Sequence, residues 1–213
     1  KSRGSSHYIS CDEINSIIRD NSGMMWLGSI GGGVLNADIH QSMFTFHSLN
    51  FADDDIPTTS VRSLFTDSDN NIWMGIGTYG LACLEYATGK LKSHSQMPEF
   101  TGMTIPTVFS VVQRKGSGEI WFGTYDGGIF AYHKGQRVRN LTPENCKFLG
   151  SSCVSALYED KYANCWVGTR GSLGVQLADG NSFLFENMSF VDGAQLNWFY
   201  VRDIIADSDN SMW

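Results

Sequence analysis

Apolar and polar residues alternate along this chain in short blocks, a pattern typical of β-strands joined by turns. The block from Val61 to Leu84 contains an apolar run, a polar turn, a run with Trp-Met-Gly, a glycine-rich turn and another apolar run. The same arrangement recurs about every 47 residues, four times in full and once in part. Its copies begin at Ile14, Val61, Val108, Val154 and Val201. An internal repeat is therefore the main feature of the sequence.

Three further landmarks keep step with the repeat. An acidic residue follows the first residue of most copies by six positions, a tryptophan by twelve or thirteen, and a glycine lies two beyond each complete tryptophan motif. The acids are Asp20, Asp67, Asp160 and Asp207, with Arg114 in the third copy. The tryptophans are Trp26, Trp73, Trp121, Trp166 and Trp213, and the glycines are Gly28, Gly75, Gly123 and Gly168. We interpret the tryptophans and glycines as structural, with each tryptophan packed between neighbouring sheets.

The turn before each tryptophan is rich in Asn, Asp and Gly, as expected for hairpins. Three residues before the tryptophan stand Gly23, Asn70, Gly118, Ala163 and Asn210. Gly and Asn suit a turn position with positive φ, whereas Ala does not. We therefore expect a different turn at Ala163.

Each copy predicts a four-stranded antiparallel meander, with very low helix content. One such sheet cannot bury both faces alone, but sheets stacked face to face around an axis can. We predict an all-β fold, a β-propeller present as an incomplete arc of about four and a half blades. The predicted blades cover residues 14–48, 61–94, 108–141 and 154–186, with a truncated blade at 201–213. Because exposed sheet edges invite pairing, we expect an open arc or closure by association with another copy.

Composition and charge argue against a disordered chain and against a nucleic-acid-binding protein. Apolar residues make up 42% of the chain and aromatic residues 13%, which excludes a disordered chain. The net charge of −7 argues against a nucleic-acid partner, which requires a basic surface. The sequence has neither a long apolar run for a membrane helix nor the apolar region of a signal peptide. Both ends interrupt the pattern, so we expect a piece of a longer protein.

Metal and cofactor motifs are weak. The five cysteines form no C-x-x-C pair, although Cys146 and Cys153 could form a disulfide in an oxidising compartment. The Asp67–Asn71 segment resembles part of a calcium loop, but a polar hairpin turn explains it more simply. The glycines of Gly75–Gly80 match a dinucleotide-binding spacing, but a strand and not a helix follows. We expect no metal, no cofactor and no catalytic residues in this segment.

The repeat resembles a known family. The segments Asp67–Gly75, Asp160–Thr169 and above all Gly118–Ile129 are similar to the two-component-regulator propeller repeat. The resemblance extends from about Ile14 to Trp213. Departures from the family pattern are Arg114 in the position of the acid, Asn or Ala in place of the turn glycine, and the shifted glycine Gly174 in the fourth copy.

This resemblance implies an extracytoplasmic sensor. Such repeats are typical of hybrid two-component system histidine kinases of gut Bacteroidetes. Their periplasmic part carries tandem, usually seven-bladed propellers, followed by an immunoglobulin-like domain, a membrane helix and a kinase. The implied ligand is an oligosaccharide released from a glycan. The implied partners are the remaining blades and downstream domains, and a second copy in a homodimer of the parent protein.

Residues on the loops between strands are the candidates for ligand binding, because loop differences carry function on a repeated scaffold. Sugars are bound by aromatic faces together with planar polar groups. Side chains of these kinds, on loops that we expect at one face, are Tyr79, Tyr125, Asp126, Arg170 and Trp198. The alternative to a sensor is a propeller enzyme acting on glycans as a hydrolase or lyase, which would need acidic residues converging at the channel mouth.

Overall fold

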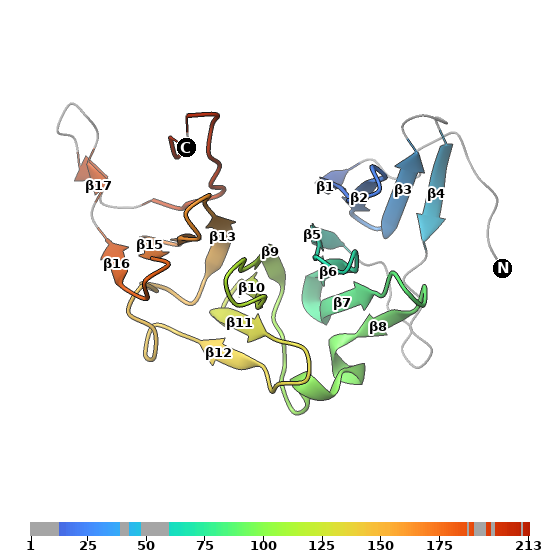
Figure 1. Cartoon of the computed structure of the whole chain (residues 1–213), viewed down its shortest axis with the longest axis horizontal. Coiled ribbons are helices and arrows are strands. Elements are labelled where there is room, and N and C mark those ends of the chain that lie inside the picture. The colour runs from blue at the N-terminus through green and yellow to red at the C-terminus, as the bar shows by residue number, and fades with distance from the viewer. Residues whose placement is uncertain are drawn as a thin grey trace. The chain divides into compact units, whose positions relative to one another are not determined.

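The computed structural model describes residues 13–38, 43–47, 60–186, 188–189, 195–196, 199–209 and 211–213. Its architecture is all-β, with four four-stranded antiparallel sheets (Figure 1). In each sheet the strands lie in chain order, which confirms the predicted meanders. We call each four-stranded sheet a blade.

The first blade contains β1 (Ile14–Arg19), β2 (Met25–Ser29), β3 (Val34–Asp38) and β4 (Met43–His47). The second contains β5 (Val61–Thr66), β6 (Ile72–Ile76), β7 (Gly80–Leu84) and β8 (Leu91–Ser93). The third contains β9 (Val108–Gln113), β10 (Ile120–Thr124), β11 (Ile129–Tyr132) and β12 (Arg139–Leu141). The fourth contains β13 (Val154–Glu159), β14 (Cys165–Thr169), β15 (Leu173–Gln176) and β16 (Ser182–Phe185). The remaining elements are the short pair β17 (Met188–Ser189) and β18 (Gln195–Leu196), and three 3-10 turns, η1 (Gly77–Tyr79), η2 (His94–Gln96) and η3 (Pro98–Phe100).

The chain divides into two compact units. The first ends at Val108 and holds the first two blades, and the second begins at Phe109 and holds the third and fourth. Each unit has its own hydrophobic core, centred on Val61, Met74 and Ile76 in the first and on Trp121, Val154 and Val167 in the second. Within each unit the first strand of one blade packs against the preceding blade, with β5 on β1 and β2, and β13 on β10.

The glycine two beyond each tryptophan lies where the next copy of the repeat approaches. A Cβ atom built on Gly75 would lie 2.3 Å from the carbonyl oxygen of Val108, the first residue of the next copy. The corresponding first residues, Val61, Val154 and Val201, approach the same positions at Gly28, Gly123 and Gly168, at 2.6, 2.7 and 2.4 Å. The repeated glycine is thus the site of close contact between successive copies.

Polar side chains near the start of a blade fasten it to the next copy. Ser63 Oγ donates a buried hydrogen bond to the Val108 carbonyl at 3.0 Å, and Asn15 Nδ2 donates to the Val61 carbonyl at 3.2 Å. Ser155 Oγ bonds the Val201 carbonyl in the same way. A register shift follows the first residue of β1, β5 and β13, so the ladder is irregular next to the residues that make these bonds.

The expectation of a different turn at Ala163 is wrong. Ala163 has φ of 63°, close to the 65° of Asn70 in the equivalent turn. Both turns contain the same backbone bond, from the N–H of this residue to the carbonyl of the aspartate three positions earlier. The carboxylate of Asp160 also accepts the N–H groups of Tyr162 and Asn164, which holds the turn despite the unfavourable φ.

Relief of this strain is testable with Ala163→Gly. Because a left-handed conformation costs an L-residue about 1–2 kcal/mol and glycine almost nothing, we expect the free energy of unfolding to rise by up to about 1 kcal/mol. Ala178→Gly, in the nearby β15–β16 turn without positive φ, should instead lower it by up to about 1 kcal/mol. Thermal and denaturant unfolding would measure both changes. A loss of stability in Ala163→Gly would contradict the strain argument.

The described cysteines are buried free thiols. Cys146 and Cys153, considered as a disulfide pair, are both free, as are Cys83 and Cys165. Burial raises the pKa of the Cys165 thiol to about 12, so this residue behaves as a small apolar side chain. Cys11 lies outside the described residues.

Candidate functional site

The repeated aspartate and tryptophan form a hydrogen-bonded clasp. In the second blade, Asp67 Oδ1 accepts the N–H groups of Asp69 and Asn71, each at 2.9 Å, and its Oδ2 accepts the indole N–H of Trp73 at 2.8 Å. The same indole-to-carboxylate bond joins Trp26 to Asp20, Trp166 to Asp160 and Trp213 to Asp207, at 2.8, 3.1 and 3.0 Å. The aspartate oxygens face N–H donors, which is the arrangement of a polar turn and not of a cation site.

The pKa values of three of these aspartates agree with a structural role. Burial alone would raise the pKa of Asp20 and Asp160, but the hydrogen bonds that each carboxylate accepts outweigh it and lower the pKa. The indole N–H of Trp213 is the main cause of the lowered pKa of Asp207. Among the residues with a described structure, no three His, Cys, Asp or Glu side chains gather closely enough to hold a metal ion.

The third blade replaces this clasp with a different arrangement. Arg114 stands in the position of the aspartate, and the indole N–H of Trp121 donates instead to Glu119 Oε2 at 3.2 Å. The Arg114 guanidinium carbon lies 4.6 Å from the centre of the Trp121 ring, within the range of a cation–π contact. The ring of Phe148 is stacked parallel to that of Trp121, with the ring centres 5.9 Å apart.

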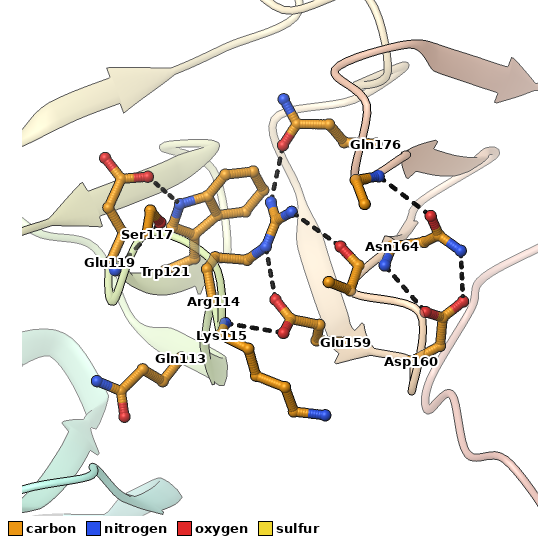
Figure 2. A network of polar contacts seen from close by, with 12 residues as sticks. Gln113, Arg114, Lys115, Ser117, Glu119, Trp121, Glu159, Asp160, Asn164 and Gln176 are labelled. Atoms are coloured by element: carbon orange, nitrogen blue, oxygen red, sulfur yellow. Dashed lines mark hydrogen bonds and ion pairs between the residues drawn. The ribbon is translucent and has the colours of Figure 1, made fainter.

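Arg114 also reaches across to the fourth blade, as Figure 2 shows. Its Nε donates to Glu159 Oε2 at 2.7 Å, and a terminal nitrogen donates to Gln176 Oε1 at 2.7 Å. The other terminal nitrogen donates to the Ala163 carbonyl at 3.3 Å. Glu159 Oε1 accepts the backbone N–H of Lys115 at 2.8 Å, so both of its oxygens are engaged. The ion pair is nearly buried, with side-chain exposures of 12% for Arg114 and 3% for Glu159.

A cavity of about 650 Å³ lies beside this network, between the third and fourth blades of the second unit. This volume is within the range of small-molecule sites. Its charged lining residues are Arg114, Glu119, Arg139 and Lys147, and Asn145, Gln176, Ser117 and Ser182 add polar groups. Arg139 forms an ion pair with Glu119 Oε1 at 2.5 Å. Burial would raise the pKa of Glu119, but the bonds from Arg139 and Trp121 and the nearby positive charges lower it, so the group stays ionised.

Two of the predicted binding turns meet in the second unit. The β10–β11 turn, which carries the exposed Tyr125 and Asp126, bonds the Ser152 carbonyl through the N–H of Gly128. The exposed Arg170 bonds the next carbonyl, that of Cys153, through its own N–H. The two turns therefore flank one short segment.

The surroundings of the predicted binding residues differ from one residue to the next. Tyr125 packs its ring edge-on against Phe109 at 5.9 Å. Tyr79 belongs to η1 in the first unit, where it is partly buried against the core. Trp198 lies outside the described residues. A role of these five residues in binding stays a prediction.

The cavity and the predicted turns lie at opposite ends of the same strand. The 114–119 turn precedes β10 and lines the cavity, whereas Tyr125 and Asp126 directly follow β10. The sequence interpretation did not include the cavity residues Arg139 and Lys147. Arg114 replaces the repeated aspartate in the third copy, and this replacement is the feature of the sequence that could have indicated the cavity.

Comparisons with known proteins support the repeat. Residues 55–78 match the family model described as two component regulator propeller. The chain is 22% identical over 174 residues to Histidine kinase P4 of Formosa agariphila, covering 78% of this chain and 12% of that protein. The chain thus spans only a small part of this relative.

Solved structures agree on the fold. The extracellular domain described as part of hybrid two component system BT3049 from B. thetaiotaomicron superimposes with a TM-score of 0.75 at 18% identity. That match covers 94% of this chain and 26% of the other. Virginiamycin B lyase from Staphylococcus aureus matches with a TM-score of 0.64 at 13% identity, over 94% of this chain and 69% of the lyase. At these identities the likeness shows the fold alone.

The predicted fold class is confirmed by these neighbours, since the four meanders correspond to part of a propeller. No helix within the described ranges has the length and apolar character that membrane crossing requires. Together, these findings show that the chain has the fold of part of a β-propeller and that its residues 55–78 match the two component regulator propeller model.

Proposed function

We propose that this chain is part of the periplasmic sensor propeller of a hybrid two-component signalling receptor that responds to glycan-derived oligosaccharides. In this proposal the segment binds or transmits a signal and performs no catalysis. Its partners are the other blades and downstream domains of the parent receptor, which acts as a homodimer. The observation that carries the proposal is the repeat itself, matched by the two component regulator propeller model.

The other comparisons favour the same role. The matched relative is a histidine kinase, and the neighbour with a TM-score of 0.75 is an extracellular domain of a hybrid two component system. The polar side chains of the repeats also support a scaffold, because the repeated carboxylates are occupied by indole and backbone N–H groups. Their lowered pKa at Asp20 and Asp160 is the opposite of what a general acid requires.

The propeller-enzyme alternative has the fold likeness to virginiamycin B lyase as its support. At 13% identity that likeness extends to the fold alone, so we retain the sensor as the proposal.

The experiment is a calorimetric titration of the intact protein with fractionated neutral and acidic oligosaccharides. We expect saturable binding without turnover of the sugar, as checked by chromatography after the titration. Tyr125→Ala, Arg170→Ala and Trp198→Ala should each weaken binding about tenfold or more if the predicted loop residues form the site. Tyr86→Ala is the matched control, because Tyr86 is 63% exposed and belongs to the β7–β8 turn.

The outcomes separate the candidate functions. Shortened oligosaccharides after incubation would replace the sensor with the enzyme. Absence of binding to every fraction would contradict oligosaccharide sensing. Binding that survives all three loop substitutions would support the sensor and remove the loop residues from its site.

A further inference from the structure

Several side chains that line the cavity between the third and fourth blades carry hydrogen-bond donors that are not used within the described part of the chain. Lys147 lines it with an exposed ammonium group that has no hydrogen bond or ion pair to any residue whose structure is described. Arg139 is 59% exposed and uses one nitrogen for Glu119, which leaves further N–H groups of its guanidinium directed elsewhere. The side-chain amide nitrogen of Gln176 likewise has no partner among the described residues, because its bond to Arg114 uses the oxygen.

The acidic oxygens at the cavity are already occupied. Glu119 is the acidic residue among those that line it, and its Oε1 accepts from Arg139 while its Oε2 accepts from Trp121. Glu159, behind Arg114, is occupied at both oxygens as well. The two carboxylates therefore balance the two arginines, and the charge of Lys147 remains unbalanced.

This positive cavity stands out in a chain of net charge −7. Because the whole chain repels anions, an accumulation of cationic donors at one concave site favours an anionic ligand locally. A guanidinium and an ammonium group are the donors that proteins use for carboxylates and sulfates. The amide of Gln176 and the hydroxyls of Ser117 and Ser182 suit neutral hydroxyl groups of the same ligand.

We propose that this cavity binds the carboxylate or sulfate group of an acidic oligosaccharide, with Lys147 and Arg139 as the principal contacts. The saccharide part of this assignment rests on the function proposed above. The site lies at the opposite end of β10 from Tyr125 and Asp126, so it is separate from the predicted loop site. Arg114 positions the cavity wall, because its guanidinium holds Gln176 and Glu159 in place. Each of its three nitrogens already donates a hydrogen bond within the protein, so we do not assign it a contact with the ligand.

The ion pair between Arg139 and Glu119 can remain intact when a ligand binds. An incoming carboxylate can take the guanidinium nitrogens that Glu119 does not use, so Glu119 and Trp121 keep their bond. Binding therefore needs no rearrangement of the buried network. The contribution of Lys147 is a charge-assisted hydrogen bond that is absent without ligand.

The experiment compares four probes by calorimetric titration of the intact protein. They are a trigalacturonate, the same trisaccharide with its carboxylates reduced to alcohols, a sulfated neutral trisaccharide and inorganic sulfate. We expect the trigalacturonate or the sulfated trisaccharide to bind at least about tenfold more tightly than the reduced trisaccharide, as one charge-assisted bond implies. The affinity should fall with increasing salt concentration, since the contacts are at the surface.

Substitutions of the cavity residues test whether the ligand binds in this cavity. Lys147→Gln and Arg139→Gln should each weaken binding of the acidic trisaccharide about tenfold, while binding of the reduced trisaccharide stays unchanged. Lys115→Gln is the matched control, because it removes the same charge from an exposed residue on the 114–119 turn that does not line the cavity. Thermal unfolding of each variant would show whether the fold is retained.

Several results would overturn the proposal. Equal binding of acidic and reduced trisaccharides would refute anion recognition while leaving oligosaccharide sensing intact. Equal losses in Lys147→Gln and Lys115→Gln would move the site away from the cavity. Binding of inorganic sulfate as tight as that of both acidic sugars would remove the saccharide part. Failure of every sugar to bind would refute both this inference and the proposed function.

Discussion

Gly75→Ala is expected to lower the free energy of unfolding by about 3 kcal/mol or more. The added methyl group would lie 2.3 Å from the carbonyl oxygen of Val108, which is backbone and cannot rotate away. It would also lie 2.3 Å from Ser63 Oγ and so displace the buried hydrogen bond from that hydroxyl to the same carbonyl. Overpacking a core costs about 1–3 kcal/mol and an unsatisfied buried group about 1–3 kcal/mol, and here both occur together.

Gly77→Ala provides the control for this substitution. Gly77 lies two residues further along the chain, and its added Cβ would meet its nearest atom, the Ser60 carbonyl oxygen, at an ordinary 3.6 Å. We expect a change within about 0.5 kcal/mol, as for most surface substitutions. Denaturant unfolding of both variants would measure the difference. Similar stabilities of Gly75→Ala and Gly77→Ala would contradict the conclusion that the repeated glycine exists for close packing.

Glu159→Ala is expected to destabilise the second unit by about 3–5 kcal/mol, the usual cost of leaving one charge of a buried pair without its partner. The substitution removes the acceptor for Arg114 Nε at 2.7 Å and for the Lys115 backbone N–H at 2.8 Å. Arg114 is 12% exposed, so water can replace only part of the lost contact. Denaturant unfolding would give the loss in stability.

The matched control is Glu85→Ala, which removes a surface partner of Lys92. That pair has side-chain exposures of 39% for Lys92 and 30% for Glu85, and we expect its loss to cost below about 1 kcal/mol. Removing both Arg114 and Glu159 should cost less than the sum of the two single changes, with a coupling of about 1.5 kcal/mol or more. Additive effects in this double-mutant cycle would show that the two side chains do not stabilise each other.

The repeat made much of the fold predictable. Hairpin turns and strands depend on residues close in sequence, so the meanders of all four blades followed from the spacing of apolar runs, Asn, Asp and Gly. The Asp-to-Trp spacing is equally local, because Asp67 and Trp73 are joined through a single turn. Ala163 shows the weakness of a rule based on one position. Its intrinsic preference is overcome by the bonds that the Asp160 carboxylate accepts.

The candidate site was much less predictable. Tyr125, Asp126 and Arg170 were chosen as loop residues of suitable chemistry, and the structure places their turns beside one segment. The cavity at the other end of β10 escaped notice because its residues come from turns and connections of two blades. Lys147 has no distinguishing neighbour in sequence, and only its place in the lining of the same cavity as Arg139 and Gln176 gives it a chemical meaning.

The sequence by itself determined the class of fold, the four-stranded meander of each complete copy and the spacing of aspartate and tryptophan, because all of these depend on residues within one hairpin or on a period repeated along the chain. Only the tertiary structure decided which partners a residue that departs from the repeat, such as Arg114, contacts. Arg114 meets Glu159, Gln176 and Ala163 across 45, 62 and 49 residues of chain, and the stacking of two twisted sheets sets those distances. Side-chain contacts between blades depend on that stacking, which no spacing within a single repeat specifies.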